Sequence, residues 1–312
     1  MDYIKKGLVF KPEGNYDWMH YYAGPLTPVE FDDFIRVYFT TRNKIGEDGI
    51  FNSRISFVDC DKNDPTKLLY IHNKPLIEFG LPGTFDEHGT TVCEVLLRDG
   101  KYHMYYLGWQ RTDTAPYVIR MGLAISDDGV EFTKISDGPV LGLNRFLPYG
   151  IGNISILEED GTFHMWYTHY TAWLKTQKGY RPTYDIRYAH SANGLDWVFG
   201  KECISGLMHN EAIASPSVKK INGKYHMWYC YRPGVDEMGR SGPYLIGYAV
   251  SDNKTDWTRM DETVNIALSA TGWDSEMVCY PEILQTKDNL FMFYAGNHYG
   301  RDGFGCAVIE NL

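Results

Sequence analysis

Several common functional motifs and targeting segments are missing from this sequence. No stretch reaches the roughly 18 consecutive apolar residues of a membrane-spanning helix. The N-terminus, MDYIKKGLVFKPEGNYDW, has no apolar segment followed by a small-residue cleavage site. There is also no Gly-x-Ser-x-Gly, no Walker loop and no Gly-x-Gly-x-x-Gly after a predicted strand. We therefore expect a cytoplasmic protein outside the classes that these motifs define.

Cysteine and positive charge are also scarce. The six cysteines are scattered with no Cys-x-x-Cys pair, which favours free thiols in a reducing compartment. The formal net charge of -10 argues against a nucleic-acid partner or an anionic membrane. Aromatic residues, by contrast, make up 15% of the chain, with 24 Tyr and 8 Trp. Such enrichment suits β-strands and also sugar-stacking surfaces, so we expect a small-molecule or oligosaccharide partner. The oligomeric state does not follow from the sequence.

One aromatic segment occurs three times in nearly the same form. It is GKYHMYYLGW from Gly100, GTFHMWYTHY from Gly161 and GKYHMWYCYR from Gly223. The markers Tyr102, Phe163 and Tyr225 are spaced by 61 and 62 residues, and Phe291 follows 66 residues later. A related strand surrounds Val37. The spacing indicates five copies of a unit of about 62 residues.

Each unit contains the pattern of a small antiparallel sheet. An apolar run is followed by a turn, with Asp-Gly or Asn-Gly in the middle copies, and then by the aromatic strand and two further strands. Four short strands repeated at this period are typical of propeller blades. We predict an all-β, five-bladed β-propeller that forms a single domain over 1–312. The predicted blades are roughly 15–80, 81–142, 143–205, 206–268 and 269–312, with an N-terminal strand at 1–14.

The first strand of each blade lines the central channel of a propeller, so functional residues should recur near its start. We align these strands on Pro25, Cys93, Ile154, Pro216 and Pro281. Five positions earlier stand His20, His88, Tyr149, Glu211 and Glu276. One position later stand Leu26, Glu94, Ser155, Ser217 and Glu282. We predict that most of these side chains face one central cavity.

The four glutamates are the candidate catalytic residues. Two carboxyl groups across a cleft suit general acid–base chemistry when burial keeps one of them protonated. Glycoside hydrolysis uses such a pair. The competing interpretation is that Glu94 and Glu282 only pair with arginines and orient the structure.

The candidate substrate-binding residues are polar or aromatic and lie near strand ends. Arginines there could hold an anionic group, and aromatic rings could stack on a sugar. The predicted set is His20, His88, Tyr149, Arg42, Arg187, Arg232, Trp109 and Tyr280, with Trp18 and Trp173 as further stacking candidates. We assign no definite cofactor. A divalent cation held by His20, His88, Glu211 and Glu276 is an alternative without a supporting sequence motif.

The blade pattern resembles the five-bladed propeller glycosidases, that is, glycoside hydrolase families 32, 43, 62, 68, 117 and 130. The clearest local match is VCEVLLRDGKYHMYY. On this match Glu94 falls where family 43 has the aspartate that tunes the pKa of the catalytic acid. Two family motifs are absent: the first-blade Asp-Pro is Gly24-Pro25 here, and GIGNISIL lacks the glutamate of the general acid.

Three functions are consistent with these observations. The first is cleavage of a glycosidic bond, by hydrolysis or phosphorolysis, with Glu211 and Glu276 as proton donor and base and Glu94 tuning them. The second is cytosolic metabolism of a sugar nucleotide or surface glycan, in which the same pocket takes an activated or anionic sugar. The third is a propeller that binds carbohydrate without catalysis.

Overall fold

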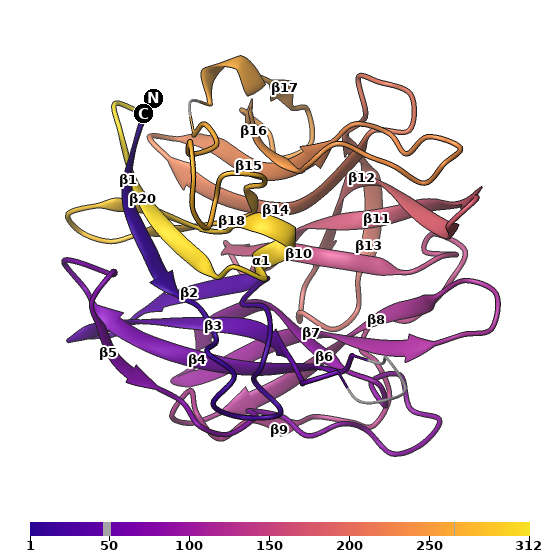
Figure 1. Ribbon diagram of the computed structural model, residues 1–312, viewed down its shortest axis with the longest axis horizontal. Helices are drawn as coiled ribbons and strands as arrows, with labels where there is room; N and C mark the ends of the chain where they lie inside the picture. The colour runs from indigo at the N-terminus through magenta and orange to yellow at the C-terminus, as the bar shows by residue number, and fades with distance from the viewer. Residues whose placement is uncertain (46–50, 265) are drawn as a thin grey trace.

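The computed structural model describes residues 1–45, 51–264 and 266–312. Over these residues the chain forms five four-stranded antiparallel sheets around a central axis (Figure 1). The predicted all-β, five-bladed propeller is therefore confirmed. No helix in the described part of the chain is long and apolar enough to span a membrane.

The strands follow one another radially, from the innermost strand of each blade to the outermost. The first blade contains β2 (Leu26–Glu30), β3 (Phe34–Arg42), β4 (Ser53–Asp61) and β5 (Leu68–Ile71). The second contains β6 (Thr90–Arg98), β7 (Lys101–Arg111), β8 (Tyr117–Ser126) and β9 (Thr133–Lys134). The third contains β10 (Ile151–Glu159), β11 (Thr162–Thr176), β12 (Gly179–Ser191) and β13 (Val198–Ile204). The fourth contains β14 (Ala212–Ile221), β15 (Lys224–Arg232), β16 (Leu245–Ser251) and β17 (Thr258–Arg259).

The last blade combines both ends of the chain. Its order is β18 (Cys279–Gln285), β19 (Leu290–Ala295), β20 (Phe304–Glu310) and then β1 (Asp2–Phe10). Strand β1 pairs with β20 from Asp2 opposite Glu310 to Phe10 opposite Phe304, so the two termini lie side by side (Figure 1). Two short helical turns, η1 (Asp261–Thr263) and α1 (Asn297–Gly300), complete the described structure. The N-terminal strand thus closes the ring.

The repeated aromatic strands join neighbouring blades. In each of the first three blades, an aromatic side chain of the second strand donates a hydrogen bond to a backbone carbonyl in a turn of the next blade. The pairs are Tyr38 to Gly129 (2.7 Å), Tyr105 to Gly194 (3.2 Å) and Trp166 to Lys254 (2.8 Å). The aromatic repeat therefore supplies hydrogen bonds between neighbouring blades.

A second set of contacts links the innermost strands. We call the three residues that make these contacts, Glu94, Ser155 and Ser217, the inner-strand seam. Each of these side chains accepts a hydrogen bond from a backbone N–H of the following blade. The donors are Ile156 to Glu94 Oε2, Val218 to Ser155 Oγ and Ile283 to Ser217 Oγ, all at 3.0 Å. These residues come from the row one position after the alignment anchors. They hold consecutive inner strands at a fixed spacing.

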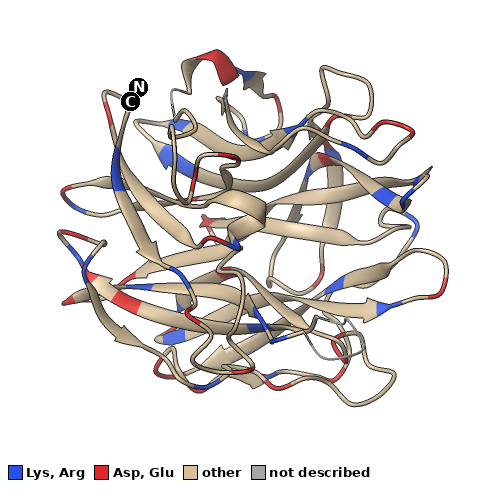
Figure 2. Cartoon of the chain, viewed as in Figure 1, with Lys and Arg blue, Asp and Glu red and all other residues tan. Residues whose placement is uncertain are grey.

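The apolar core lies between the faces of adjacent sheets rather than at the central axis. The largest fully buried side chains are aromatic, with Trp166 and Trp228 at 0% exposure. In the view of Figure 2, acidic and basic residues alternate around the outer loops and edges of the ring. The first strand of each blade surrounds the interior of the ring. The site described next lies at the N-terminal ends of these strands.

Candidate functional site

The inner strands become irregular where they enter the central cavity. Register shifts lie between Val92 and Glu94 in β6, and between Ile151 and Ile154 in β10. Equivalent shifts occur in β14 and β18. A β-bulge adds one residue to a strand and re-aims the side chains beside it. The bulges therefore turn a different set of residues toward the cavity than strict alternation predicts.

The inner chamber, as we call it, is a cavity of about 120 Å³ at these bulges. Besides the tyrosines, its uncharged polar side chains are Thr40, Ser53, Thr91, Asn153, Thr168 and Ser215. Three of the hydroxyls accept a hydrogen bond from the protein: Thr40 from Val92 N (3.1 Å), Thr91 from Trp109 Nε1 (2.9 Å) and Thr168 from Ser215 N (2.9 Å). A hydroxyl that accepts still has its own proton to donate. The chamber thus presents hydrogen-bond donors to a ligand.

Aromatic rings form the walls of the chamber. Trp109 and Tyr117 pack with centroids 4.5 Å apart, and Tyr170 and Tyr184 pack at 4.8 Å. Burial raises the pKa of Tyr117, Tyr184, Tyr244 and Tyr280. These hydroxyls therefore stay protonated at neutral pH. They can donate hydrogen bonds, but they do not provide a base.

The chamber opens into a wider outer cavity of about 570 Å³, which we call the vestibule. The two cavities share a set of lining residues: Arg42, Trp109, Tyr117, Tyr184, Tyr244, Tyr280 and Tyr299. The vestibule adds Arg181 and Arg232, together with aromatic side chains that include Trp173 and Tyr180. Among the described residues, no carboxylate lines either cavity. The combined site is aromatic and positively charged.

Unusual backbone conformations are concentrated in this lining. Tyr22, Ser215, Tyr280 and Tyr299 have φ values of 64°, 56°, 53° and 64°. Residues other than glycine rarely adopt positive φ, and bulky residues do so at an energetic cost. Strain of this kind is concentrated at functional sites in proteins. This observation is independent of cavity size and indicates the same location.

The structure separates the four predicted catalytic glutamates into three environments. Glu94 and Glu282 are both buried and interact with each other, and neither lines the chamber. Burial raises the pKa of both carboxyl groups, and the charge of Glu94 raises that of Glu282 further, while Lys219 acts in the opposite direction. Thr91 lines the chamber. Glu94 lies three residues further along β6, so the Cα atoms of Thr91 and Glu94 are about 10 Å apart at the usual strand spacing.

The other two glutamates lie at separate places. Glu211 is buried in an ion pair with Arg259 at 3.1 Å and accepts a hydrogen bond from Leu207 N at 2.6 Å. Glu276 is 64% exposed and pairs with His298 at 3.2 Å. Neither lines the chamber or the vestibule. The structure therefore does not bring the four carboxyl groups into one cavity, and their catalytic role stays a prediction.

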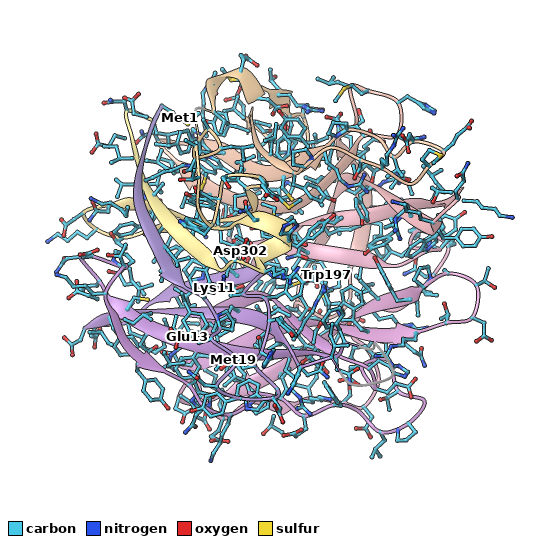
Figure 3. The ribbon with its side chains drawn as sticks, viewed as in Figure 1. Met1, Lys11, Glu13, Met19, Trp197 and Asp302 are labelled. Carbon is cyan, nitrogen blue, oxygen red and sulfur yellow. The ribbon has the colours of Figure 1, made fainter. Side chains whose placement is uncertain are left out.

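The predicted binding residues also divide. Arg42, Arg232, Trp109 and Tyr280 line the vestibule, and so does Trp173. His20 lines a different cavity beside the ion pair of Lys11 and Asp302 (Figure 3). The remaining three lie outside both cavities: Arg187 is bonded to Asp185, His88 contacts Glu87, and Tyr149 is 43% exposed.

The predicted metal ligands are not assembled. His20, His88, Glu211 and Glu276 occupy the separate positions given above. In the described ranges, no group of three or more His, Cys, Asp and Glu side chains is placed to hold a metal ion.

Sequence inspection did not identify Arg181, Asn153 or Ser215 as site residues. Arg181 lies on β12, in a hairpin whose strands β11 and β12 have 15 and 13 residues. This length, relative to the other blades, is the signal that could have indicated an extension over the cavity. Asn153 and Ser215 stand directly before two of the alignment anchors, where the bulges re-aim the chain.

Comparisons with known proteins agree with the fold. No family model matches the sequence. The chain is 31% identical over 315 residues to the uncharacterized protein Rv1502 of Mycobacterium tuberculosis, covering 100% of both. It is 26% identical over 237 residues to a 1,2-β-oligomannan phosphorylase of Thermoanaerobacter sp. strain X514, covering 73% of this chain and 71% of that protein.

Solved structures show the same architecture at low sequence identity. One described as a glycoside hydrolase has a TM-score of 0.74 and 14% identity, and covers 99% of this chain and 92% of its own. A second comes from the GH130 family of mannoside phosphorylases, described as containing hydrolases that target β-1,2 mannosidic linkages in Candida mannan. Its TM-score is 0.70 at 15% identity, with coverage of 99% and 94%.

The chain therefore has the five-bladed propeller fold found in GH130 and other glycoside hydrolase-like proteins, as the sequence resemblance implied. By its full-length similarity it belongs to the same protein family as Rv1502 of Mycobacterium tuberculosis.

Proposed function

We propose that this protein is a carbohydrate-active enzyme that binds a sugar in the inner chamber and cleaves its glycosidic bond. The observation that carries the proposal is the chamber itself, where uncharged hydrogen-bonding groups stand between aromatic walls. Sugar rings have polar edges and apolar faces, so such a lining matches them. Enclosed pockets with few polar groups among aromatic side chains are typical ligand sites.

The comparisons support cleavage rather than binding alone. One relative is named as a phosphorylase of β-1,2-linked oligomannan, and a structural neighbour is described as targeting β-1,2 mannosidic linkages. We therefore choose β-1,2-linked mannosides as the first substrates to test. Whether water or phosphate attacks the sugar is left to the assay, because both reactions suit this fold.

Cleavage requires a proton donor for the leaving oxygen. We retain the four glutamates as candidates. Glu94 and Glu282 have the raised pKa that such a donor needs, whereas Glu211 and Glu276 lie in loops outside the chamber. Separate glutamine variants should identify the donor by a loss of turnover of at least about 100-fold, the scale of general acid catalysis.

The experiment incubates the purified protein with β-1,2-mannobiose and longer oligomers, with and without inorganic phosphate. Anion-exchange chromatography detects free mannose, and ³¹P NMR detects sugar phosphate. Phosphate-dependent formation of a sugar 1-phosphate indicates phosphorolysis, and free sugar formed without phosphate indicates hydrolysis.

A substitution in the chamber tests whether any turnover occurs at this site. Asn153→Ala should raise the KM about tenfold, the effect of one lost hydrogen bond of about 1.4 kcal/mol. Unchanged kinetics of Asn153→Ala would place the sugar elsewhere and contradict the proposal.

A second candidate is a sugar-binding propeller without catalysis. It is favoured by the lack of a carboxylate among the described residues that line the two cavities. Saturable binding of an oligosaccharide, weakened about tenfold by Asn153→Ala, together with no product across a broad panel of glycosides, would support this candidate over the first.

A further inference from the structure

We infer that the ligand of this site has a fixed negative charge outside the sugar ring, and that Arg181 and Arg232 in the vestibule bind it. The inference rests on the proposed function, because it assumes that a sugar occupies the inner chamber. It adds the chemical class of that ligand: a glycoside bearing a carboxylate or a phosphoryl group.

Arg232 is the strongest part of the argument. Its side chain is buried, with the residue only 5% exposed, yet it lines the vestibule. Its guanidinium donates to two backbone carbonyls, Pro233 O and Pro182 O, both at 3.3 Å, and interacts with the Tyr244 hydroxyl, but none of the described carboxylates pairs with it. The guanidinium also lies 5.5 Å from the ring centroid of Tyr244. Burying a positive charge is unfavourable unless an anion pairs with it.

Arginines elsewhere in this protein do have carboxylate partners. The buried Arg36 forms a two-pronged contact with Asp59 at 2.8 and 2.9 Å. Arg259 bonds to Glu211 and to Asp261. Arg232 therefore differs from comparably buried arginines of the same chain. An oxyanion of the ligand would supply the partner that the described lining lacks.

Arg181 places a second positive charge at the same opening. The only hydrogen bond described for its side chain is to Tyr180 O at 3.5 Å. Pro182, which follows Arg181 directly, accepts the bond from Arg232, so the two arginine-bearing segments are in contact. Paired guanidinium groups suit carboxylate and phosphate oxygens, which they can bind through two parallel hydrogen bonds.

The position of the charges relative to the chamber sets the position of the anion. Arg181 and Arg232 line the vestibule and do not line the inner chamber. The uncharged polar groups lie inward, at the bulges, and Arg42 lines both cavities where they meet. A ligand that satisfies both parts has a neutral ring inside and an anionic group toward the opening.

The size and chemistry of the vestibule favour an organic anion over a small inorganic one. Its volume of about 570 Å³ exceeds what free phosphate occupies. Trp173 and Tyr180 line it beside the arginines and provide apolar surface for a second moiety. We therefore assign the charge to the glycoside, and free phosphate becomes an alternative for the experiment to exclude.

Calorimetry with matched pairs of probes tests this inference. Methyl β-glucuronide is compared with methyl β-glucoside, mannose 1-phosphate with methyl mannoside, and inorganic phosphate is titrated alone. At least one charged probe should bind about 10- to 100-fold more tightly than its neutral counterpart, because each charge-assisted hydrogen bond contributes on that scale. Its affinity should fall as salt rises.

Variants locate the effect. Arg181→Gln should remove most of the preference for the charged probe and leave the affinity for the neutral probe unchanged. Arg232→Lys keeps a charge but loses the planar fork, so it should weaken binding of the charged probe in the same way. Arg240→Gln is the control, because Arg240 is exposed, pairs with Asp236 and does not line the vestibule. Arg181 is partly exposed, so its variant remains informative if Arg232→Lys fails to fold.

Three results would overturn the inference. They are equal affinities within every pair, no binding by any member of the panel at millimolar concentration, and binding of inorganic phosphate as tight as that of the best charged sugar. Turnover of a neutral glycoside with no charge preference would reject this inference and keep the proposed function. Charge-dependent binding without turnover on any glycoside would reject the proposed function and keep this inference.

Discussion

Replacing Glu282 with glutamine should make the protein more stable at neutral pH and leave its stability near pH 4 almost unchanged. Glu282 is 6% exposed, and its carboxyl group interacts with that of Glu94. Lys219 is the cation that acts on both. Two carboxyl groups therefore share one lysine, and glutamine at position 282 would leave a balanced pair of Glu94 and Lys219.

The sign of the pH dependence follows from the direction of the shift. Burial and the charge of Glu94 raise the pKa of Glu282 in the folded protein above that of the unfolded chain. A group raised in this way contributes stability fully below its unfolded pKa of about 4.3, and that contribution is lost as the pH rises through the folded pKa. The variant lacks this loss, so its advantage should grow from about pH 5 upward.

The expected gain at pH 8 is about 1–3 kcal/mol. Replacing buried charged groups by uncharged ones of similar volume is commonly neutral or stabilising by about 1–4 kcal/mol, and Lys219 offsets part of the original cost. In a chain of this size, each kcal/mol corresponds to at most about 2–4 °C in Tm.

Urea unfolding at several pH values measures this difference, with an unchanged m-value as the check on two-state behaviour. Glu276→Gln is the control, because its carboxyl group is 64% exposed and should give no pH-dependent gain. A variant that is less stable than the wild type at pH 8, or a difference in stability that is independent of pH, would refute this account of the Glu94 and Glu282 pair.

Two further predictions concern the ring itself. Ser155→Ala removes the acceptor of the buried Val218 N–H and should lower the free energy of unfolding by about 1–3 kcal/mol, measured by urea denaturation; a neutral result would show that the inner-strand seam adds no stability. Gly305→Ala should destabilise by a similar about 1–3 kcal/mol, because the added Cβ would lie 2.3 Å from Gly7 O and 2.4 Å from the Trp273 ring. Gly138→Ala, which meets no atom within 4 Å, is the control for thermal unfolding.

Much of the fold could be predicted because its determinants are local and repeated. The strand that includes Tyr105 recurs with a similar turn before it, and Tyr105 and Trp166 in successive copies make the same contact with the next blade. A pattern that is written several times can be recognised without knowledge of any long-range contact. The fold class therefore followed from spacing and turn chemistry alone.

The site was harder to predict because it depends on irregular features. A bulge shifts the alternation by one residue, so Asn153 lines the chamber although the aligned rows on either side did not include it. An alignment of equal offsets placed Glu211 and Glu276 near the axis. Loops of different length instead carry both residues away from it. Arg42 and Arg232 were found because they end strands of the aromatic hairpins, whose register is regular.

The closure of the last blade has a consequence for synthesis in the cell. Of the strands described, β1 is translated first and its partner β20 last. At about 5–20 residues per second, the first strand waits on the order of 15–60 s before it can dock. During that interval the nascent chain is an open array of blades with exposed edges. A ribosome that stalls before β20, or a variant that lacks Asp2–Phe10, would therefore yield a chain unable to complete its circle.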